Sequence, residues 1–222
     1  MPTTLTSSEN VAIIHWDDGK ANAVNFELID AMNQHLDKVE RDADALVIVG
    51  RPGVFCGGFE LKILREASDE TVEDLIEQGG ELAERLFTFP KPVVIASTGH
   101  AIAQGAAFLL SADFRIGARG TFKTGLNETQ IGMTLRHFGP TLAKARLAAP
   151  FFTRAAVLGE LFDPEDALNA GYLDELNEPI QVETAAINHA RAFAKLPQKA
   201  FYENKLLMRR EAIEALKAKS PL

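Results

Sequence analysis

The 222-residue sequence contains little of what several classes of protein require. Its one cysteine, Cys56, cannot form a disulfide within the chain, and so low a cysteine content is typical of a reducing compartment. No apolar run is long enough to span a bilayer, so we expect no membrane insertion. Basic residues are not in excess, and the formal net charge of −8 argues against a nucleic-acid partner.

The first ten residues, MPTTLTSSEN, also lack the features of a targeting segment. They have neither the charged nor the apolar region of a secretory signal, and they contain no arginine, which mitochondrial transit peptides use abundantly. We therefore expect a cytoplasmic protein. The length fits a single domain with a sizeable core.

Apolar periodicity predicts strands alternating with helices, which is the pattern of an α/β protein. We expect strands at 11–16, 45–49 and 92–97 and a short one at 172–176. Helices are expected at 25–39, at 61–86 with a break near Ser68, at 140–147, 153–158, 180–196 and 199–217, and between Asp163 and Gly171.

The stretch 91–132 has the most distinctive pattern. A strand of β-branched residues is broken at Gly99, the small residues around Gly105 follow, and then comes an almost wholly apolar helix. A buried helix that starts at such a turn directs its first N–H groups into a pocket, where they can stabilise an oxyanion. Ordinary packing of strand, turn and helix would also explain the small residues.

A second stretch repeats this arrangement. RPGVFCGGFELK, residues 51–62, follows the strand at 45–49 and precedes a helix. Gly57 and Gly58 form a second place where bare backbone can face a ligand. The chain therefore builds a strand, a glycine turn and a helix twice.

Together these two stretches resemble the enoyl-CoA hydratase/isomerase family, also called the crotonase family. Asn22-Ala23-Val24-Asn25 is similar to the family's early loop beside the CoA adenine, and Asp113 fits the start of a later strand. The resemblance implies an α/β fold, a crotonase-like spiral of β-β-α units in about 1–150 with a short helical C-terminal region in about 151–222. It also implies a homotrimer or a dimer of trimers.

The resemblance implies an acyl-CoA thioester as substrate, with no separate cofactor and no metal. By motif position, the backbone N–H groups of Phe59 and Gln104 bind the thioester oxygen, and Glu128 is the catalytic glutamate. The expected substrate-binding residues are Asn22, Ala23, Gly57, Gly58, Lys62 and Gly105. Lys62 is expected near the CoA phosphates, since an acidic protein needs local positive charge there.

Glu128 lies in the run Gly-Leu-Asn-Glu-Thr-Gln, residues 125–130. An ordinary helix start, with Asn127 as its cap and Glu128 at the positive end of the dipole, would also explain this run. By resemblance, Glu128 is instead a general base. A carboxylate in an apolar pocket has the raised pKa that a base acting near neutral pH requires.

Ala107 decides between the family's two main reactions. Hydratases use a second glutamate three residues after the oxyanion residue to orient water, and a methyl group cannot replace it. One carboxylate suffices to move a double bond. The runs 125–130, 51–55 and 153–164 also resemble the mitochondrial type of 3,2-trans-enoyl-CoA isomerase, so we expect an isomerase of fatty acid β-oxidation. A hydratase, another crotonase-type reaction and a non-catalytic acyl-CoA binder are the alternatives.

The chain departs from the family at both oxyanion positions. Gln104 replaces the usual glycine and Phe59 replaces a small or aliphatic residue. Both retain the N–H, while their side chains are expected to crowd the acyl pocket or alter its shape. His100 is predicted to be a pocket-wall or packing residue, because no second His or Cys lies nearby at metal-ligand spacing. His137 is predicted to be structural, and Cys56 to be a small buried residue.

Overall fold

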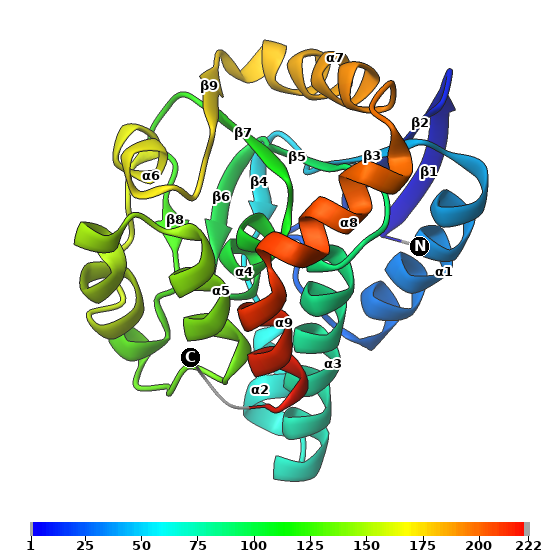
Figure 1. Cartoon of the computed structure of the whole chain (residues 1–222). Coiled ribbons are helices and arrows are strands. Elements are labelled where there is room, and N and C mark those ends of the chain that lie inside the picture. Colours follow the sequence, from blue (N-terminus) through cyan, green and yellow to red (C-terminus); the bar gives the residue numbers. More distant parts are fainter. Residues whose placement is uncertain (1, 220–222) are drawn as a thin grey trace.

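Two sheets form the frame of the molecule in the computed structural model, which describes residues 2–219 (Figure 1). The larger has the strand order β1-β2-β3-β5-β7-β9 and the smaller β4-β6-β8. The strands are β1 (Thr3–Ser8), β2 (Val11–Trp16), β3 (Ala45–Val49), β4 (Gly53–Cys56), β5 (Val93–Ser97), β6 (Gly99–Ile102), β7 (Phe114–Ala118), β8 (Thr124–Gly125) and β9 (Glu175–Asn177). β1 and β2 pair antiparallel, and the pairs between the other named strands are parallel.

Helices surround these sheets. They are α1 (Phe26–Asp42), α2 (Leu61–Glu66), α3 (Asp69–Phe87), α4 (Gln104–Ser111), α5 (Phe138–Arg146), α6 (Pro164–Ala170), α7 (Val182–Phe193), α8 (Gln198–Met208) and α9 (Arg210–Lys217). Short turns are η1 (Glu128–Ile131), η2 (Ala149–Phe151), η3 (Thr153–Val157) and η4 (Pro179–Gln181). Among the described helices, none is long and apolar enough to cross a membrane.

The chain repeats a β-β-α unit three times. The first strand of each unit (β3, β5 or β7) joins the larger sheet, and the second (β4, β6 or β8) joins the smaller sheet. Helical segments then follow, namely α2 and α3, then α4, then η1 and α5. This confirms the predicted α/β spiral of β-β-α units.

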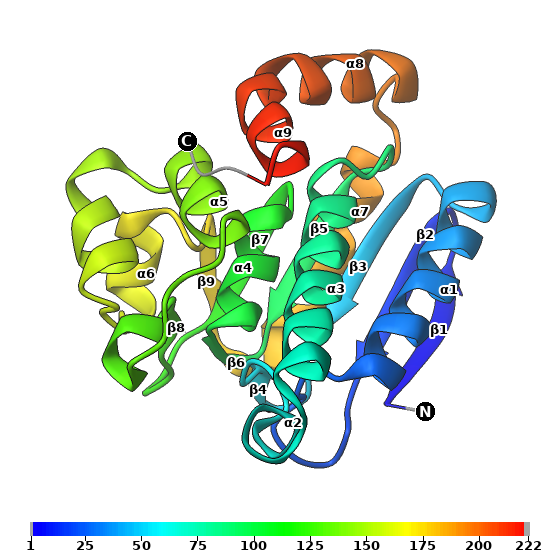
Figure 2. The same ribbon diagram turned by 90° about the horizontal axis from the view of Figure 1, so that it is seen from below.

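The central strands are buried on both faces, as their continuous apolar runs predict. On one face, Leu46 and Ile48 belong to the main core with α1, α3 and α4, which lie side by side in Figure 2. On the other face, Val47 and Val49 form a second cluster with Ala186 and other residues of α7. This two-sided cover holds the strands in place and so fixes where they end.

The sequence-based prediction missed β1 and the second strand of every unit. Gly99, expected to end a strand in a turn, instead begins β6. A Cβ on Gly99 would lie 1.9 Å from the carbonyl carbon of Gly53, so only glycine allows β4 and β6 to approach here. The strands β4, β6 and β8 have two to four residues each and contain glycine, so they look like turns in the sequence.

The N-terminal ends of two predicted helices are confirmed. The Ser68 hydroxyl accepts from the backbone N–H of Thr71 and separates α2 from α3, at the predicted break. The Asp163 carboxylate caps α6 through the N–H of Asp166, and Gly171 ends that helix with φ 96°. Thr153, predicted as another cap, is already the first residue of the π-helical turn η3 and caps nothing.

The C-terminal region differs from the prediction in two ways. The single helix expected at 199–217 is two helices, α8 and α9, which meet at Arg209. The guanidinium of Arg209 donates to Phe87 O (2.6 Å) and to Asp113 Oδ1 (2.9 Å), contacts far away in sequence that anchor the chain at this junction. In addition, β9 begins three residues later than predicted, and it pairs with β7 inside the region expected to be helical.

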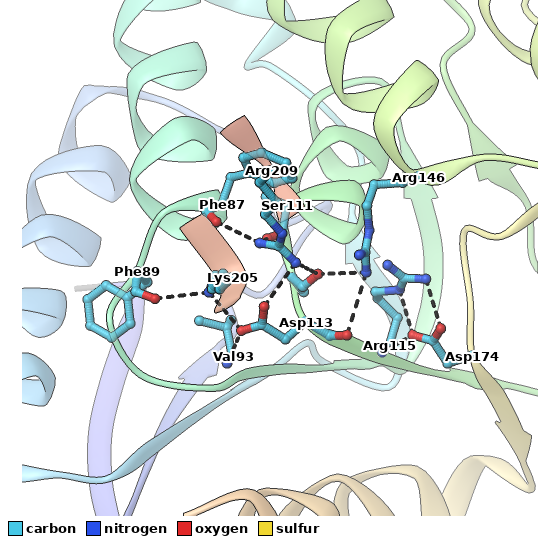
Figure 3. A network of polar contacts seen from close by, with 11 residues as sticks. Phe87, Phe89, Val93, Ser111, Asp113, Arg115, Arg146, Asp174, Lys205 and Arg209 are labelled. Carbon is cyan, nitrogen blue, oxygen red and sulfur yellow. Dashed lines mark hydrogen bonds and ion pairs between the residues drawn. The ribbon is translucent and has the colours of Figure 1, made fainter. Parts of the chain in front are cut away.

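The carboxylate of Asp113 ties this C-terminal region to the core (Figure 3). It accepts from the N–H of Val93 at the start of β5 (2.8 Å). It also accepts from Lys205 Nζ in α8 (2.8 Å) and from Arg209 Nη2 (2.9 Å). Lys205 is only 7% exposed, and burial lowers the pKa of its amine to about 8 against the opposing effect of Asp113. One carboxylate thus joins β5, β7 and α8.

Lys205, Arg209 and a third cation, Arg146, also lie at the carboxyl ends of two helices. Arg209 donates to Phe87 O at the end of α3, Lys205 donates to Phe89 O (2.9 Å), and Arg146 donates to Ala112 O just past α4 (3.0 Å). The carboxyl end of a helix carries partial negative charge, which stabilises a nearby cation. Helix dipoles therefore help to balance the excess of cations in this network.

Removing the carboxylate tests this network. Asp113→Ala leaves Lys205 and Arg209 buried without it, and we expect the free energy of unfolding to fall by about 3–5 kcal/mol in urea titrations. The matched control is Asp163→Ala, which removes an exposed helix cap and should cost about 1 kcal/mol. Equal losses in the two variants would contradict the role given to Asp113.

Candidate active site

The three predicted catalytic residues follow three neighbouring parallel strands. Cys56 at the end of β4 pairs with Ala101 of β6, and Ile102 at the end of β6 pairs with Gly125 of β8. Segments 57–59, 103–104 and 126–128, which hold Phe59, Gln104 and Glu128, come directly after these ends. We call this place, the carboxyl ends of β4, β6 and β8, the strand-end edge. Parallel sheets bind ligands at such an edge.

The first two turns on this edge pack directly against each other. A Cβ on Gly58, which has φ 98°, would lie 3.1 Å from Ala103 Cβ and 4.0 Å from the backbone nitrogen of Gln104. A Cβ on Gly105 would lie 2.5 Å from Cys56 O. The two glycines thus let the two turns meet, and they bring the Phe59 and Gln104 backbones together.

Both predicted oxyanion donors have an available N–H. Gln104 opens α4, where N–H groups have no acceptor within the helix. Across residues 2–219, neither the Gln104 nor the Phe59 N–H donates to a protein acceptor. Val24 N–H donates to Gly58 O (2.8 Å) and Glu60 N–H donates to Val24 O (2.9 Å), so the backbone on both sides of Phe59 is fixed.

Ala103, just before Gln104, has a strained backbone that the sequence did not indicate. Its φ of 52° and ψ of −118° lie in a region that residues with a side chain rarely adopt. Its N–H donates to Gly125 O (2.9 Å), a contact between β6 and β8 that holds this conformation. Strain of this kind concentrates at functional sites, where surrounding contacts maintain it.

The side chains of Phe59 and Gln104 pack toward α3, where both contact Gly79. Gln104 Nε2 donates to Gly79 O (2.7 Å), and a Cβ on Gly79 would lie 2.5 Å from Phe59 Cε1. The next residue, Gly80, similarly makes room for the ring of Phe138, which a Cβ would approach to 2.6 Å. The sequence analysis missed this role, although two adjacent glycines inside a helix were the signal.

Glu128 is the first residue of η1 and is half-buried. Its Oε2 is buried, and within residues 2–219 it has no hydrogen-bond partner. Burial raises the pKa of this carboxyl above its ordinary value of 4.5, opposed by a hydrogen bond from its own N–H. As in the alternative interpretation of this run, Asn127 occupies the N-cap position and Glu128 lies in the first turn of η1, but the Asn127 side chain makes no capping hydrogen bond.

An open groove of about 600 Å³ borders the edge at the turn that holds Gly57 and Phe59. Four predicted site residues line it: Ala23, Gly57, Phe59 and Lys62. Lys62 is exposed there, and the other charged residues of the lining are Lys20 and four acids, Asp17, Asp18, Glu27 and Glu60. The volume is in the range of small-molecule and cofactor sites.

The Asn22 side chain holds the loop beside this groove from within the core. Its side chain is fully buried; Nδ2 donates to Trp16 O (2.7 Å) and Phe55 O (3.1 Å), and Oδ1 accepts from Asp18 N (3.0 Å). The loop at 22–25 is therefore joined to β2 and β4. Asn22 itself has φ 49°, a conformation that asparagine tolerates better than most residues.

His100 and Cys56 are packing residues, as predicted. The Nδ1 of His100 accepts from the N–H of Lys123 (3.0 Å), and its ring meets the edge of Phe122. Cys56 is fully buried, and burial raises the pKa of its thiol to about 12, which excludes a reactive thiolate at neutral pH.

Comparison with known proteins identifies the family of the chain. A family model described as enoyl-CoA hydratase/isomerase matches residues 6–221. The chain belongs to the enoyl-CoA hydratase/isomerase family. The resemblance read from the two glycine turns is thereby confirmed, and with it the assignment of the chain to a family of acyl-CoA enzymes.

Relatives of the chain within this family include proteins named isomerases and proteins named hydratases. The chain is 27% identical to human mitochondrial enoyl-CoA delta isomerase 1 over 93% of its length and 70% of that protein. It is 31% identical to a probable enoyl-CoA hydratase, EchA17 of Mycobacterium avium, over 72% of its length and 62% of that protein. Membership of the family therefore leaves the reaction open.

Solved structures show the same division of names. One Mycobacterium tuberculosis protein has been solved both as the probable enoyl-CoA hydratase EchA3 and as an enoyl-CoA isomerase. The first structure is 40% identical with a TM-score of 0.96 and covers 99% of this chain and 93% of its own. The second is 41% identical with a TM-score of 0.94 and covers 98% and 95%.

The raised pKa of Glu128 predicts a stability change with a definite sign. Between pH 4.5 and the raised pKa, the folded protein binds more protons than the unfolded chain, so the free energy of unfolding falls as pH rises. Glu128→Gln carries no charge to bury. In urea titrations it should be more stable than the wild type at neutral pH, with a difference that shrinks toward pH 4.5. A wild type that gains stability over the variant on going to neutral pH would contradict this.

Proposed function

We propose that this member of the family is a cytoplasmic enoyl-CoA isomerase of fatty acid β-oxidation, which moves the double bond of a 3-enoyl-CoA to the 2-trans position. The observation that carries the proposal is the pairing of Glu128 with Ala107. Glu128 is a half-buried residue at the strand-end edge whose Oε2 is buried. Ala107 is a buried methyl group in α4, at the position where a hydratase has its second glutamate.

One carboxylate is enough for the reaction. Glu128 removes a proton from C2 of the 3-enoyl thioester, and the electrons of that C–H bond move toward the thioester oxygen. The resulting dienolate carries its negative charge on this oxygen, which accepts hydrogen bonds from the N–H groups of Phe59 and Gln104. The carboxyl group then returns the proton to C4, and the double bond lies between C2 and C3. Proton and charge are conserved, and no water is needed.

The surroundings of Glu128 suit this role. Burial raises the pKa of its carboxyl against the opposing effect of its own backbone N–H, and among the described residues no second carboxylate contributes. A base with a raised pKa removes a weakly acidic proton more readily than an ordinary carboxylate. The available N–H groups of Phe59 and Gln104 act together with it, since the α proton becomes acidic only as charge develops on the oxygen.

The groove beside Phe59 is our candidate for the CoA moiety. Lys62 is exposed on it and supplies positive charge for the phosphates, and Ala23 and Gly57 offer small surfaces for close contact. A thioester entering from this groove meets the first oxyanion donor, Phe59, at its inner end. Because Gly57 and Phe59 line the groove and also belong to the first turn of the strand-end edge, we place the thioester where the groove meets that turn.

The trimer, or dimer of trimers, also stays a prediction from the family. Large apolar side chains are exposed on α8 and near η3, namely Leu207, Met208, Val157 and Leu158. Contact with further copies of the chain would remove this surface from water, which favours association.

Removing the base tests the mechanism. Glu128→Gln should lower kcat for isomerisation by at least about three orders of magnitude, because both general-base catalysis and its positioning are lost. The assay follows the ultraviolet absorbance of the conjugated 2-enoyl thioester formed from a 3-enoyl-CoA. Acyl-CoA binding by the variant, measured calorimetrically, is the control. A variant that retains more than about a tenth of the activity would remove Glu128 from the mechanism.

Hydration separates the two reactions that the relatives' names leave open. The wild-type protein should add water to a 2-enoyl-CoA far more slowly than it isomerises the matching 3-enoyl-CoA, since Ala107 cannot orient water. Chromatography of both products from one panel of esters measures the ratio. Efficient formation of 3-hydroxyacyl-CoA would make the protein a hydratase, and binding without either product would make it a non-catalytic acyl-CoA binder.

A further inference from the structure

The two oxyanion donors are connected through their side chains as well as through their turns. Phe59 comes from the turn after β4 and Gln104 from the first turn of α4, yet both side chains end at one residue of a third element, Gly79 of α3. Figure 2 shows α3 and α4 next to each other along the face of the larger sheet. A movement of α3 at this point therefore reaches both donors.

The Phe59 ring occupies the space that a side chain on residue 79 would need. A Cβ built there would lie 2.5 Å from Phe59 Cε1 and 2.6 Å from Cζ, far inside van der Waals contact. An added methyl group would therefore force the Phe59 ring away from α3, either by rotation of its side chain or by a shift of the backbone that carries the N–H. Gly79 consequently determines how closely Phe59 approaches α3.

The Gln104 amide makes the second connection to the same residue. Gln104 is 1% exposed, and its Nε2 donates to Gly79 O over 2.7 Å in a fully buried position. Buried hydrogen bonds of this kind hold their partners in one geometry, since breaking them leaves polar groups unpaired. The first turn of α4 is thereby fixed to α3, along with the Gln104 N–H.

We propose that Gly79 and the side-chain amide of Gln104 are positioning residues that set the spacing of the two oxyanion N–H groups. This rests on the proposed function, in which those groups bind the thioester oxygen. A hydrogen-bonded clamp between α4 and α3 takes the place of the glycine usual at position 104, and Gly79 provides the room for a phenylalanine at position 59. Phe59 and Gln104, the two residues that depart from the family, thus act together through their contacts with Gly79.

The test measures polarisation of a bound thioester, which needs no turnover. The probe is 2,4-hexadienoyl-CoA, whose absorbance band moves to longer wavelength when hydrogen bonds draw electrons toward the carbonyl oxygen. The full-length wild type should bind the probe with a red shift. Gly79→Ala should lose most of the shift, and kcat/KM for a 3-enoyl-CoA should fall by about 10²-fold, mainly in kcat, because the donors are misplaced.

Two variants separate positioning from general damage. Gly80→Ala adds the same methyl group one residue along α3, where it meets Phe138 instead of a donor residue, and it should retain the red shift. In the double variant Gly79→Ala, Phe59→Leu, the smaller side chain makes room for the methyl, and most of the shift should return. Equal loss of the shift in Gly79→Ala and Gly80→Ala would overturn the proposal, as would failure of the double variant to recover.

Gln104→Leu tests the side-chain amide, and it also tests the positioning role if Gly79→Ala does not fold. Leucine fills similar space and cannot donate to Gly79 O, so the red shift and kcat should fall while KM changes little. An unchanged red shift in this variant overturns the role of the amide. If the wild type shows the red shift but isomerises no 3-enoyl-CoA, the proposed function is refuted and the positioning role is retained. If the wild type shows no red shift, the positioning role is refuted.

Discussion

The close approach of β4, β6 and the turns that follow them is the constraint on which the rest of this structure depends. At Gly99, Gly58 and Gly105, a single added carbon would meet neighbouring backbone or Cβ atoms at 1.9 to 3.1 Å. Because backbone and Cβ atoms do not move when side chains rotate, no side-chain rearrangement can relieve these contacts. The glycines therefore place two available N–H groups together, and the neighbouring strand β8 brings the carboxylate of Glu128 to the same edge.

The site holds several unfavourable features that the surrounding frame maintains. Ala103 has a strained backbone, the carboxyl of Glu128 is partly desolvated, and the N–H groups of Phe59 and Gln104 have no protein acceptor within the described residues. Each costs stability, and each is useful for holding a charged transition state. The larger sheet, covered on both faces, and the Asp113 network that holds α8 supply the rigidity that keeps them in place.

Much of this could be predicted from the sequence, and the failures share a cause. Strands β2 and β3 and the break at Ser68 are encoded by local runs and caps, so they were found. The strands β4, β6 and β8 were missed because they are short and glycine-rich, and pairing with one another is what makes them strands. The division of the last helix at Arg209 was missed for a related reason, since its partners Phe87 and Asp113 lie about 100 residues away.

The sequence by itself determined the family, the residue types at the candidate site and the absence of a second glutamate at Ala107, because short motifs with fixed spacing carry that information. Only the tertiary structure decided where the Phe59 and Gln104 side chains go, why α3 contains Gly79 and Gly80, and that the Asn22 side chain supports its loop from within the core. These outcomes depend on atoms brought together from separate β-β-α units. Distance along the chain says nothing about such contacts, whereas the packing of the units against one another fixes them.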